Sequence, residues 1–186
     1  MSTTIELLPQ QLVTLPRASI SALRTALLRD AGPGFSSYLQ EAGYAGGEAI
    51  YAAFREWLTA RGADLPEDLP IGAFATQSAA FFTDTGWGHF DVTPIRDLAA
   101  IIESSDWAES DPDARFDHPS CHFTTGLLAD FFGRVASTPL AVLEVECRSS
   151  GGECCRFIAG SAEVMQHVYD RMADGADHMA ALDELE

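Results

Sequence analysis

Hydrophobic residues in the first 80 positions recur at helical spacing, so residues 1–80 are expected to form a mainly helical N-terminal half. Ser19 is placed to cap the first helix, and Gly32, Pro33 and Gly34 then break it. The glycines within residues 43–47 fit either a turn between two helices or a close approach of two backbones. The pattern predicts helices over residues 19–29, 35–42, 49–60 and 73–83.

From Gly86 onward the pattern changes to strand-like alternation. Strands are expected over residues 87–92, 98–102, 140–147 and 153–159. Pro94 is read as the break between the first two strands, and a helix from Cys121 to about Val135 separates the two strand pairs. A closing helix over 162–180 completes the pattern. The predicted fold class is α+β, with N-terminal helices, an antiparallel sheet, a central helix and a C-terminal helix in one domain, 1–186.

Composition and charge narrow the possible partners. The chain has 186 residues and a formal net charge of -17, and all eleven of its basic residues are arginine. Nucleic acids and anionic membranes both attract positive charge, so neither is expected as a partner. No apolar run approaches the ~20 residues of a membrane span. The start, MSTTIELLPQQ, lacks the features of a signal peptide. We therefore expect a cytoplasmic protein, in which cysteines stay reduced and bind metal more often than they pair.

Three of the four cysteines lie between residues 140 and 161, and the fourth, Cys121, lies upstream. Together with Glu144, the residues Cys121, Cys147 and Cys155 offer three thiolates and one carboxylate, which suits a closed tetrahedral zinc site. The pattern lacks a CxxC knuckle, so residue chemistry alone does not fix the role of these cysteines. They could equally be small buried hydrophobic residues, or some could form a disulfide.

Strand geometry sets a condition on this metal site. Glu144 and Cys147 have opposite parity along a strand, so a regular strand would point them to opposite faces. A bulge or the start of the turn must therefore occur near Glu146 if both bind one ion. Cys154 and Cys155 are adjacent, and only one of them should reach the metal. The roles of Cys154 and His122 are left open.

Several short motifs in the second half of the chain point to a known family. They are Gly86-Trp87-Gly88, the segment 105–110 (SDWAES), Pro119-Ser120-Cys121 with Gly126, the segment 144–147 (EVEC), and Gly151 through Cys155-Arg156-Phe157. The run from Phe81 to Ser161 resembles the vinyl-4-reductase (4VR) domain family, small-molecule-binding domains related in fold to subunits of the TRAPP transport complex. The resemblance implies a zinc- and ligand-binding region over residues 81–178.

The resemblance also implies the metal and its ligands. In the zinc-binding members, which are phenol-responsive transcriptional activators, a glutamate and two cysteines follow the first cysteine at fixed intervals. Here Glu144 follows Cys121 by 23 positions, Cys147 follows Glu144 by three, and Cys155 follows Cys147 by eight, and all three intervals agree. With four protein ligands, zinc would have no open position and would be structural.

A ligand pocket is implied in the same way. Trp107 corresponds to a tryptophan whose indole N–H contacts the phenolic hydroxyl in the phenol-responsive members, although the segment from it to Cys121 is seven residues shorter here. A histidine that also contacts phenol in those members falls at Phe82, which implies a more apolar or aromatic ligand. Trp107 could instead anchor the acidic loop, and the aromatic residues could be ordinary core. The predicted lining is Phe74, Phe81, Phe82, Trp87, Trp107 and Phe131.

Catalysis has little support in the sequence. None of the histidines 89, 118, 122, 167 and 178 has a nucleophile at a recognisable spacing, and no dinucleotide or phosphate-loop motif is present, so no catalytic residue is assigned. The first hypothesis is a stand-alone, zinc-stabilised sensor or carrier that forms a homodimer, as relatives do, and reports through a separate effector protein. The second is an enzyme or accessory factor in reduction of the (bacterio)chlorophyll vinyl group. The third is a structural adaptor resembling TRAPP subunits.

Overall fold

The computed structural model describes residues 12–185, so the first eleven residues, used above to argue against a signal peptide, lie outside the described part. The α-helices are α1 (Arg17–Ala31), α2 (Phe35–Ala60), α3 (Ile71–Asp84), α4 (His122–Ala136), α5 (Ala162–Ala173) and α6 (His178–Asp183). The strands are β1 (Asp91–Ile95), β2 (Ala99–Ser104), β3 (Ala141–Glu146) and β4 (Cys155–Gly160). The predicted α+β class with an antiparallel sheet is confirmed.

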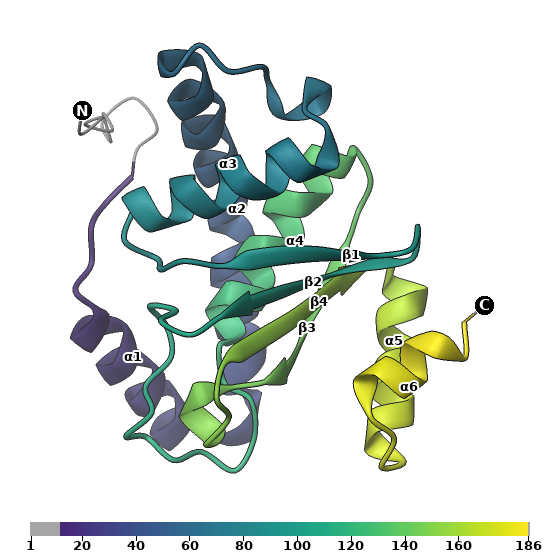
Figure 1. Cartoon of the computed structure of the whole chain (residues 1–186). Coiled ribbons are helices and arrows are strands. Elements are labelled where there is room, and N and C mark those ends of the chain that lie inside the picture. The colour runs from purple at the N-terminus through teal and green to yellow at the C-terminus, as the bar shows by residue number, and fades with distance from the viewer. Residues whose placement is uncertain (1–11, 186) are drawn as a thin grey trace.

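The four strands form one antiparallel sheet in the order β1-β2-β4-β3, with helices on both faces (Figure 1). Alternation along the strands divides the side chains between two cores. Ile102 and Phe157 point toward α2, α3 and α4, in the larger core. Ile101 and Ile158 point to the opposite face, where α5 and α6 cover them. The candidate functional residues from β3 and β4 all belong to the larger core.

The glycines at 43–47 lie inside a continuous helix, so the predicted turn between two short helices is wrong. Helix α2 runs for 26 residues, and its middle crosses α4 at very short range. A Cβ atom at Gly43 would collide with the carbonyl oxygen of Phe123, and one at Gly126 would collide with that of Gln40. Glycine is normally unfavourable inside a helix, but here it allows close packing of the two backbones. The alternative expectation, a close backbone approach, is confirmed.

Two helix boundaries also differ from the prediction. The first helix begins at Arg17 after Pro16, and Ser19 forms no cap because it lies inside the helix. At the other end, the predicted single C-terminal helix is two helices, α5 and α6. The chain turns at Gly175, whose φ of +91° favours glycine, and Asp177 then caps α6 by accepting a hydrogen bond from the N–H of Met179.

Pro94 does not break the chain between two strands as expected, because it lies within β1. Its partner in the register is Ala100 of β2, and β1 is an edge strand. An edge strand tolerates proline because the missing N–H can fall on the side without a neighbouring strand. The turn to β2 follows the end of β1 at Ile95, and it includes Arg96, whose φ is +52°.

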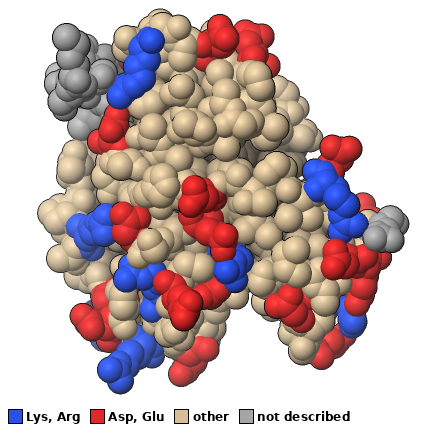
Figure 2. All heavy atoms as spheres, in the orientation of Figure 1, with Lys and Arg blue, Asp and Glu red and all other residues tan. Residues whose placement is uncertain are grey.

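Charged side chains are spread over the surface and do not form a single patch on the face in view. Figure 2 shows acidic residues on this face with arginines beside them and uncharged areas between. Several of the arginines form ion pairs, such as Arg55 with Glu67 at 2.6 Å and Arg171 with Glu184 at 2.8 Å. None of the helices in the described part of the chain is long and apolar enough to cross a membrane.

Candidate metal centre

Cys121 lies at the N-cap of α4, where the helix leaves free backbone N–H groups. Two glutamates from other segments accept hydrogen bonds from these groups. Glu144 Oε2 accepts from the N–H of Cys121 at 2.7 Å, and Glu109 accepts from the N–H groups of Phe123 at 3.0 Å and Thr124 at 2.7 Å. Carboxylates are favoured at this positive end of the helix. The start of α4 is therefore fixed by the residues that surround Cys121.

A bulge in β3 brings Glu144 and Cys147 to the same face of the sheet. Glu144 pairs with Phe157 and Glu146 with Arg156, so the register shifts between them and Val145 has no partner in β4. Glu146 then points away and pairs with Arg156 at 2.5 Å. The next residue, Cys147, returns to the face that holds Glu144. This is the irregularity that strand parity required.

The ligand atoms of Cys121, Glu144, Cys147 and Cys155 all lie within 4.8 Å of one another, and such a group could hold a metal ion. We call these four residues the ligand cluster. The Sγ atom of Cys121 lies 3.7 Å from that of Cys147 and 3.9 Å from that of Cys155. A tetrahedral zinc ion with Zn–S bonds of about 2.3 Å holds its sulfurs about 3.8 Å apart. The spacing of the thiols therefore fits zinc.

The carboxylate of Glu144 supplies a second sign of fit. One oxygen, Oε2, accepts the hydrogen bond from the Cys121 backbone, but Oε1 is buried without a hydrogen-bond partner among the described residues. A buried acceptor without a partner is unfavourable by about 1–3 kcal/mol. A metal ion bound by this oxygen would remove that penalty. All four members of the cluster are buried, so water cannot take this role at an open surface.

The protonation of the cluster shows the same imbalance. Hydrogen bonds to Cys147 and Cys155, together with burial, raise the pKa of the Cys121 thiol well above its usual value. Burial and the neighbouring Cys147 raise the pKa of Glu144. Hydrogen bonds from Cys121 and Cys155 lower the pKa of Cys147, which therefore loses its proton most readily. The protein groups alone do not stabilise four negative charges here, whereas a divalent cation would.

Neither of the two alternatives for the cysteines fits this arrangement. All four are free thiols, and the sulfur separations in the cluster are far longer than the ~2.05 Å of a disulfide. Ordinary buried hydrophobic residues would not bring a carboxylate among them, because burial of an uncompensated carboxylate is unfavourable. Cys154 is half-buried and lies outside the cluster, while Cys155 belongs to it.

His122 follows Cys121 but is not part of the ligand cluster. Its ring packs edge-on against Phe35 with centroids 5.2 Å apart, and its Nε2 atom is buried without a hydrogen-bond partner among the described residues. Burial, with smaller contributions from His118 and Arg24, lowers the pKa of His122 to about 4. A neutral imidazole is therefore expected at pH 7.

The six residues predicted to line a ligand pocket also lie together, and we call them the aromatic cluster. Five of them are buried, and Trp87 is half-buried. They pack ring against ring: Phe82 lies 5.3 Å from Phe81, 5.2 Å from Phe131 and 5.8 Å from Trp107 between centroids. Such separations are typical of favourable aromatic contacts. The cluster thus forms much of the larger core beside α4.

A buried hydrogen-bond chain joins the two clusters. Trp107 Nε1 donates to Thr124 Oγ1 at 2.7 Å, and that hydroxyl donates to Glu109 Oε2 at 2.6 Å. Glu109 also binds the start of α4, which carries Cys121. The indole N–H is therefore used within the protein. Sequence reasoning did not assign a role to Glu109, Thr124, Ser120 or Arg24, although Glu109 lies in the same motif as Trp107.

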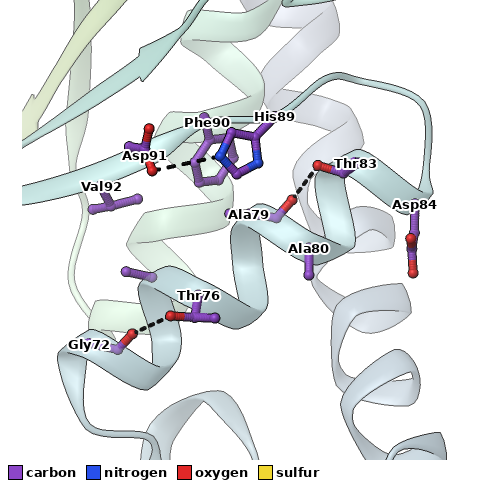
Figure 3. Close-up of a pocket in the computed structure, with 11 residues that line it drawn as sticks. Gly72, Thr76, Ala79, Ala80, Thr83, Asp84, His89, Phe90, Asp91 and Val92 are labelled. Carbon is purple, nitrogen blue, oxygen red and sulfur yellow. Dashed lines mark hydrogen bonds and ion pairs between the residues drawn. The ribbon is translucent and has the colours of Figure 1, made fainter.

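The two main hollows of the described part of the chain lie away from both clusters. The larger, of about 690 Å³, is a groove between α3 and β1, lined by small residues of the helix and by residues 89–92. Figure 3 shows Thr76, Ala79 and Ala80 on the helix side and the His89 and Asp91 pair, 3.7 Å apart, on the other. The second, of about 600 Å³, lies between α1 and residues 108–112. None of the six aromatic-cluster residues lines either hollow.

Comparison with known proteins gives the class to which this geometry belongs. Residues 111–161, which include all four members of the ligand cluster, match the family model of the vinyl-4-reductase (4VR) domain. A relative in Methanocaldococcus jannaschii, an uncharacterized protein, is 29% identical over 77 residues; the match spans 41% of this chain and 41% of that protein. The resemblance predicted from the sequence is confirmed.

Three solved structures share the fold. The phenol-responsive sensory domain of the transcription activator PoxR, solved with phenol, has a TM-score of 0.63 at 16% identity, covering 82% of this chain and 77% of that one. A vinyl-4-reductase family protein of Methanocaldococcus jannaschii has a TM-score of 0.54 at 16% identity, covering 86% and 97%. A trafficking protein particle complex subunit 3 from Naegleria fowleri, covalently bound to palmitic acid, has a TM-score of 0.57 at 14% identity, covering 77% and 91%.

Proposed function

We propose that this protein is a small-molecule-binding domain of the 4VR type whose fold is held by a structural zinc ion. Zinc would bind Cys121, Glu144, Cys147 and Cys155. The observation that carries the proposal is the burial of these four groups together, with thiols at tetrahedral spacing and one Glu144 oxygen without a partner among the described residues. Three thiolates and one carboxylate are a ligand set that zinc accepts.

The role of the metal is to join two parts of the fold. Cys121 begins α4, while the other three ligands lie on β3, β4 and the turn between them. Because four protein ligands fill a tetrahedral site, the ion would have no position for water or substrate. Structural zinc sites contribute about 10–16 kcal/mol of apparent binding free energy. Zinc would thereby hold α4, and with it Thr124 and Trp107, in place.

The ligand class follows from the aromatic cluster. The resemblance to the PoxR sensory domain supports a small molecule as the ligand. A phenolic hydroxyl would have to displace Thr124 from the Trp107 indole, and Phe82 offers no hydrogen bond. An apolar or aromatic molecule without such a hydroxyl fits these side chains better. Its binding would require the rings to move apart, so occupancy would alter the packing of α3 and α4 and could be passed to a second copy of the chain or to an effector.

The close packing of the aromatic cluster favours one other candidate, a structural adaptor. A domain whose interior is filled by its own side chains needs no ligand to fold. The likeness to a trafficking-complex subunit supports this alternative. In an adaptor the zinc site would have the same structural role, and the grooves on the surface would contact partner proteins.

Metal content and ligand content separate these candidates. Chain expressed and purified under reducing conditions without added metal is analysed by native mass spectrometry. One zinc per chain supports the metal centre, and metal-free folded chain that does not take up zinc contradicts it. Extraction with organic solvent then tests the interior: a hydrophobic molecule that co-purifies with the wild type and is lost in Trp107→Ala supports the sensor or carrier. Chain free of such a molecule, which also binds none from a panel of aromatic compounds, favours the adaptor.

A further inference from the structure

Helix α1 contacts the rest of the molecule through a charged side chain. Among the residues of α1, all of which lie in the described part of the chain, Arg24 alone is buried, with 1% of its surface exposed. The neighbouring Leu23 is 54% exposed. Burial of a charge is unfavourable unless other charges or hydrogen bonds compensate it. The helix thus buries a guanidinium where a leucine would be expected.

The Arg24 guanidinium lies beside the ligand cluster. Its Nη1 atom donates to the Glu109 carbonyl oxygen at 3.0 Å and to Ser120 Oγ at 3.4 Å. Ser120 directly precedes Cys121, and its hydroxyl lies 4.0 Å from the Sγ atom of Cys147. A single hydroxyl group therefore separates the guanidinium from a candidate metal ligand.

Within residues 12–185, no carboxylate forms an ion pair with Arg24. Its Nε and Nη2 atoms are buried without hydrogen-bond partners, and its guanidinium lies over the ring of Phe116 at 4.9 Å from the centroid. The nearby carboxylate of Glu109 is already engaged by the backbone and hydroxyl of Thr124. Direct contacts alone therefore do not explain why a positive charge is buried at this position.

The metal centre supplies the missing negative charge. Three thiolates and one carboxylate carry four negative charges, and a divalent ion neutralises two of them. The loaded site would therefore keep a net charge of about minus two in a buried environment. Charges at this range interact strongly when water is excluded, because the effective dielectric constant is low. A buried cation next to Cys147 would stabilise the loaded site.

We propose that Arg24 is a positioning residue of the metal centre, acting through Ser120 to offset the negative charge of the zinc-loaded ligand cluster. This inference rests on the proposed zinc site. It also assigns a role to α1: docking of the helix and retention of the metal support each other. Because such coupling is reciprocal, a change that releases Arg24 weakens zinc binding by the same factor by which zinc favours docking of α1.

The test measures zinc retention in variants of one position. Zinc-loaded chain is titrated with a chromogenic zinc chelator at pH 7.5 and low salt, and circular dichroism checks that each variant is folded. Arg24→Met keeps the length of the apolar stem but removes the charge, and it should weaken zinc binding roughly tenfold or more. Arg24→Lys retains the charge and should stay within about threefold of the wild type. Arg29→Met removes a charge from the same helix at a side chain that is 71% exposed, and it should change nothing.

The outcomes are distinct. Affinity that follows charge, with Lys close to Arg and Met far below, supports the proposal. Equal affinity in Arg24→Met and the wild type overturns it, and so does an Arg24→Lys variant as weak as Arg24→Met, because a purely structural role would follow shape and not charge. Should Arg24→Met fail to fold, Ser120→Ala decides: weaker zinc binding by several-fold supports the relay, and unchanged binding overturns it. A wild-type chain that holds no zinc would instead refute the metal centre itself.

Discussion

The ligand cluster and the aromatic cluster lie on the same face of the sheet and share the start of α4, but their side chains are satisfied to very different degrees. The rings of Phe81, Phe82 and Phe131 contact one another, and the indole N–H of Trp107 has a partner in Thr124. The ligand cluster instead contains an acceptor without a partner among the described residues, and more acidic groups than the protein can charge. Burial of rings is complete in itself, whereas burial of this polar cluster requires a further component.

The largest difference between the clusters should follow from the loss of a metal ligand. Cys147→Ala is expected to lose zinc and to lower the melting temperature by more than about 10 °C, because structural zinc supplies much of the folding free energy. Elemental analysis and a thermal melt measure both effects. Cys154→Ala is the matched control, since Cys154 lies next to Cys155 but outside the cluster, and it should keep its zinc. Full zinc content in Cys147→Ala would refute the assignment.

A cavity in the aromatic cluster should lower stability without removing the metal. Phe131→Ala is expected to reduce the free energy of unfolding by about 3–5 kcal/mol, because Phe131 is fully buried among other rings. Zinc content should stay at one ion per chain. Urea denaturation with elemental analysis checks this, and Tyr44→Ala, at a side chain that is 52% exposed, is the control. Zinc loss at unchanged purity would show that the two clusters are not independent.

A smaller effect should come from the crossing of α2 and α4, which supports both clusters. Gly43→Ala should destabilise the protein by about 1–3 kcal/mol, because a Cβ atom there collides with the backbone of Phe123. Gly46→Ala in the same helix is the control: its Cβ atom would lie 3.8 Å from a side-chain atom of Leu127, an ordinary contact. That substitution should stabilise the helix by about 0.5–1 kcal/mol. Equal effects of the two substitutions in denaturant titrations would contradict the close crossing.

The smallest effect concerns His122, next to the ligand cluster. Its pKa is lowered to about 4, below the value of about 6.5 expected in the unfolded chain. The unfolded chain therefore binds a proton first, so His122 costs stability as the pH falls from about 6.5 toward 4. His122→Phe removes this loss and should gain stability relative to the wild type by about 1 kcal/mol or less at pH 5, and nothing at pH 7.5. A difference in melting temperature that does not change with pH would show that His122 is not buried as a neutral group.

The sequence predicts the α+β class well because hydrophobic periodicity reflects local geometry. The same is true of the bulge near Glu146, which followed from the parity of Glu144 and Cys147. Tertiary contacts explain the errors: local preference breaks a helix at Gly43, but the close packing on α4 keeps it continuous. Arg24 could not be assigned from sequence, since an arginine on a helix is ordinarily exposed and only the fold places it beside Ser120.

X-ray absorption at the zinc edge of chain purified without added metal tests the centre most directly. We predict one zinc per chain with three sulfur neighbours at about 2.3 Å and one oxygen at about 2.0–2.2 Å, unchanged when Cys154 is replaced by alanine. A folded chain that neither carries zinc nor takes it up, or a bound ion with fewer than three sulfur neighbours, would contradict the account.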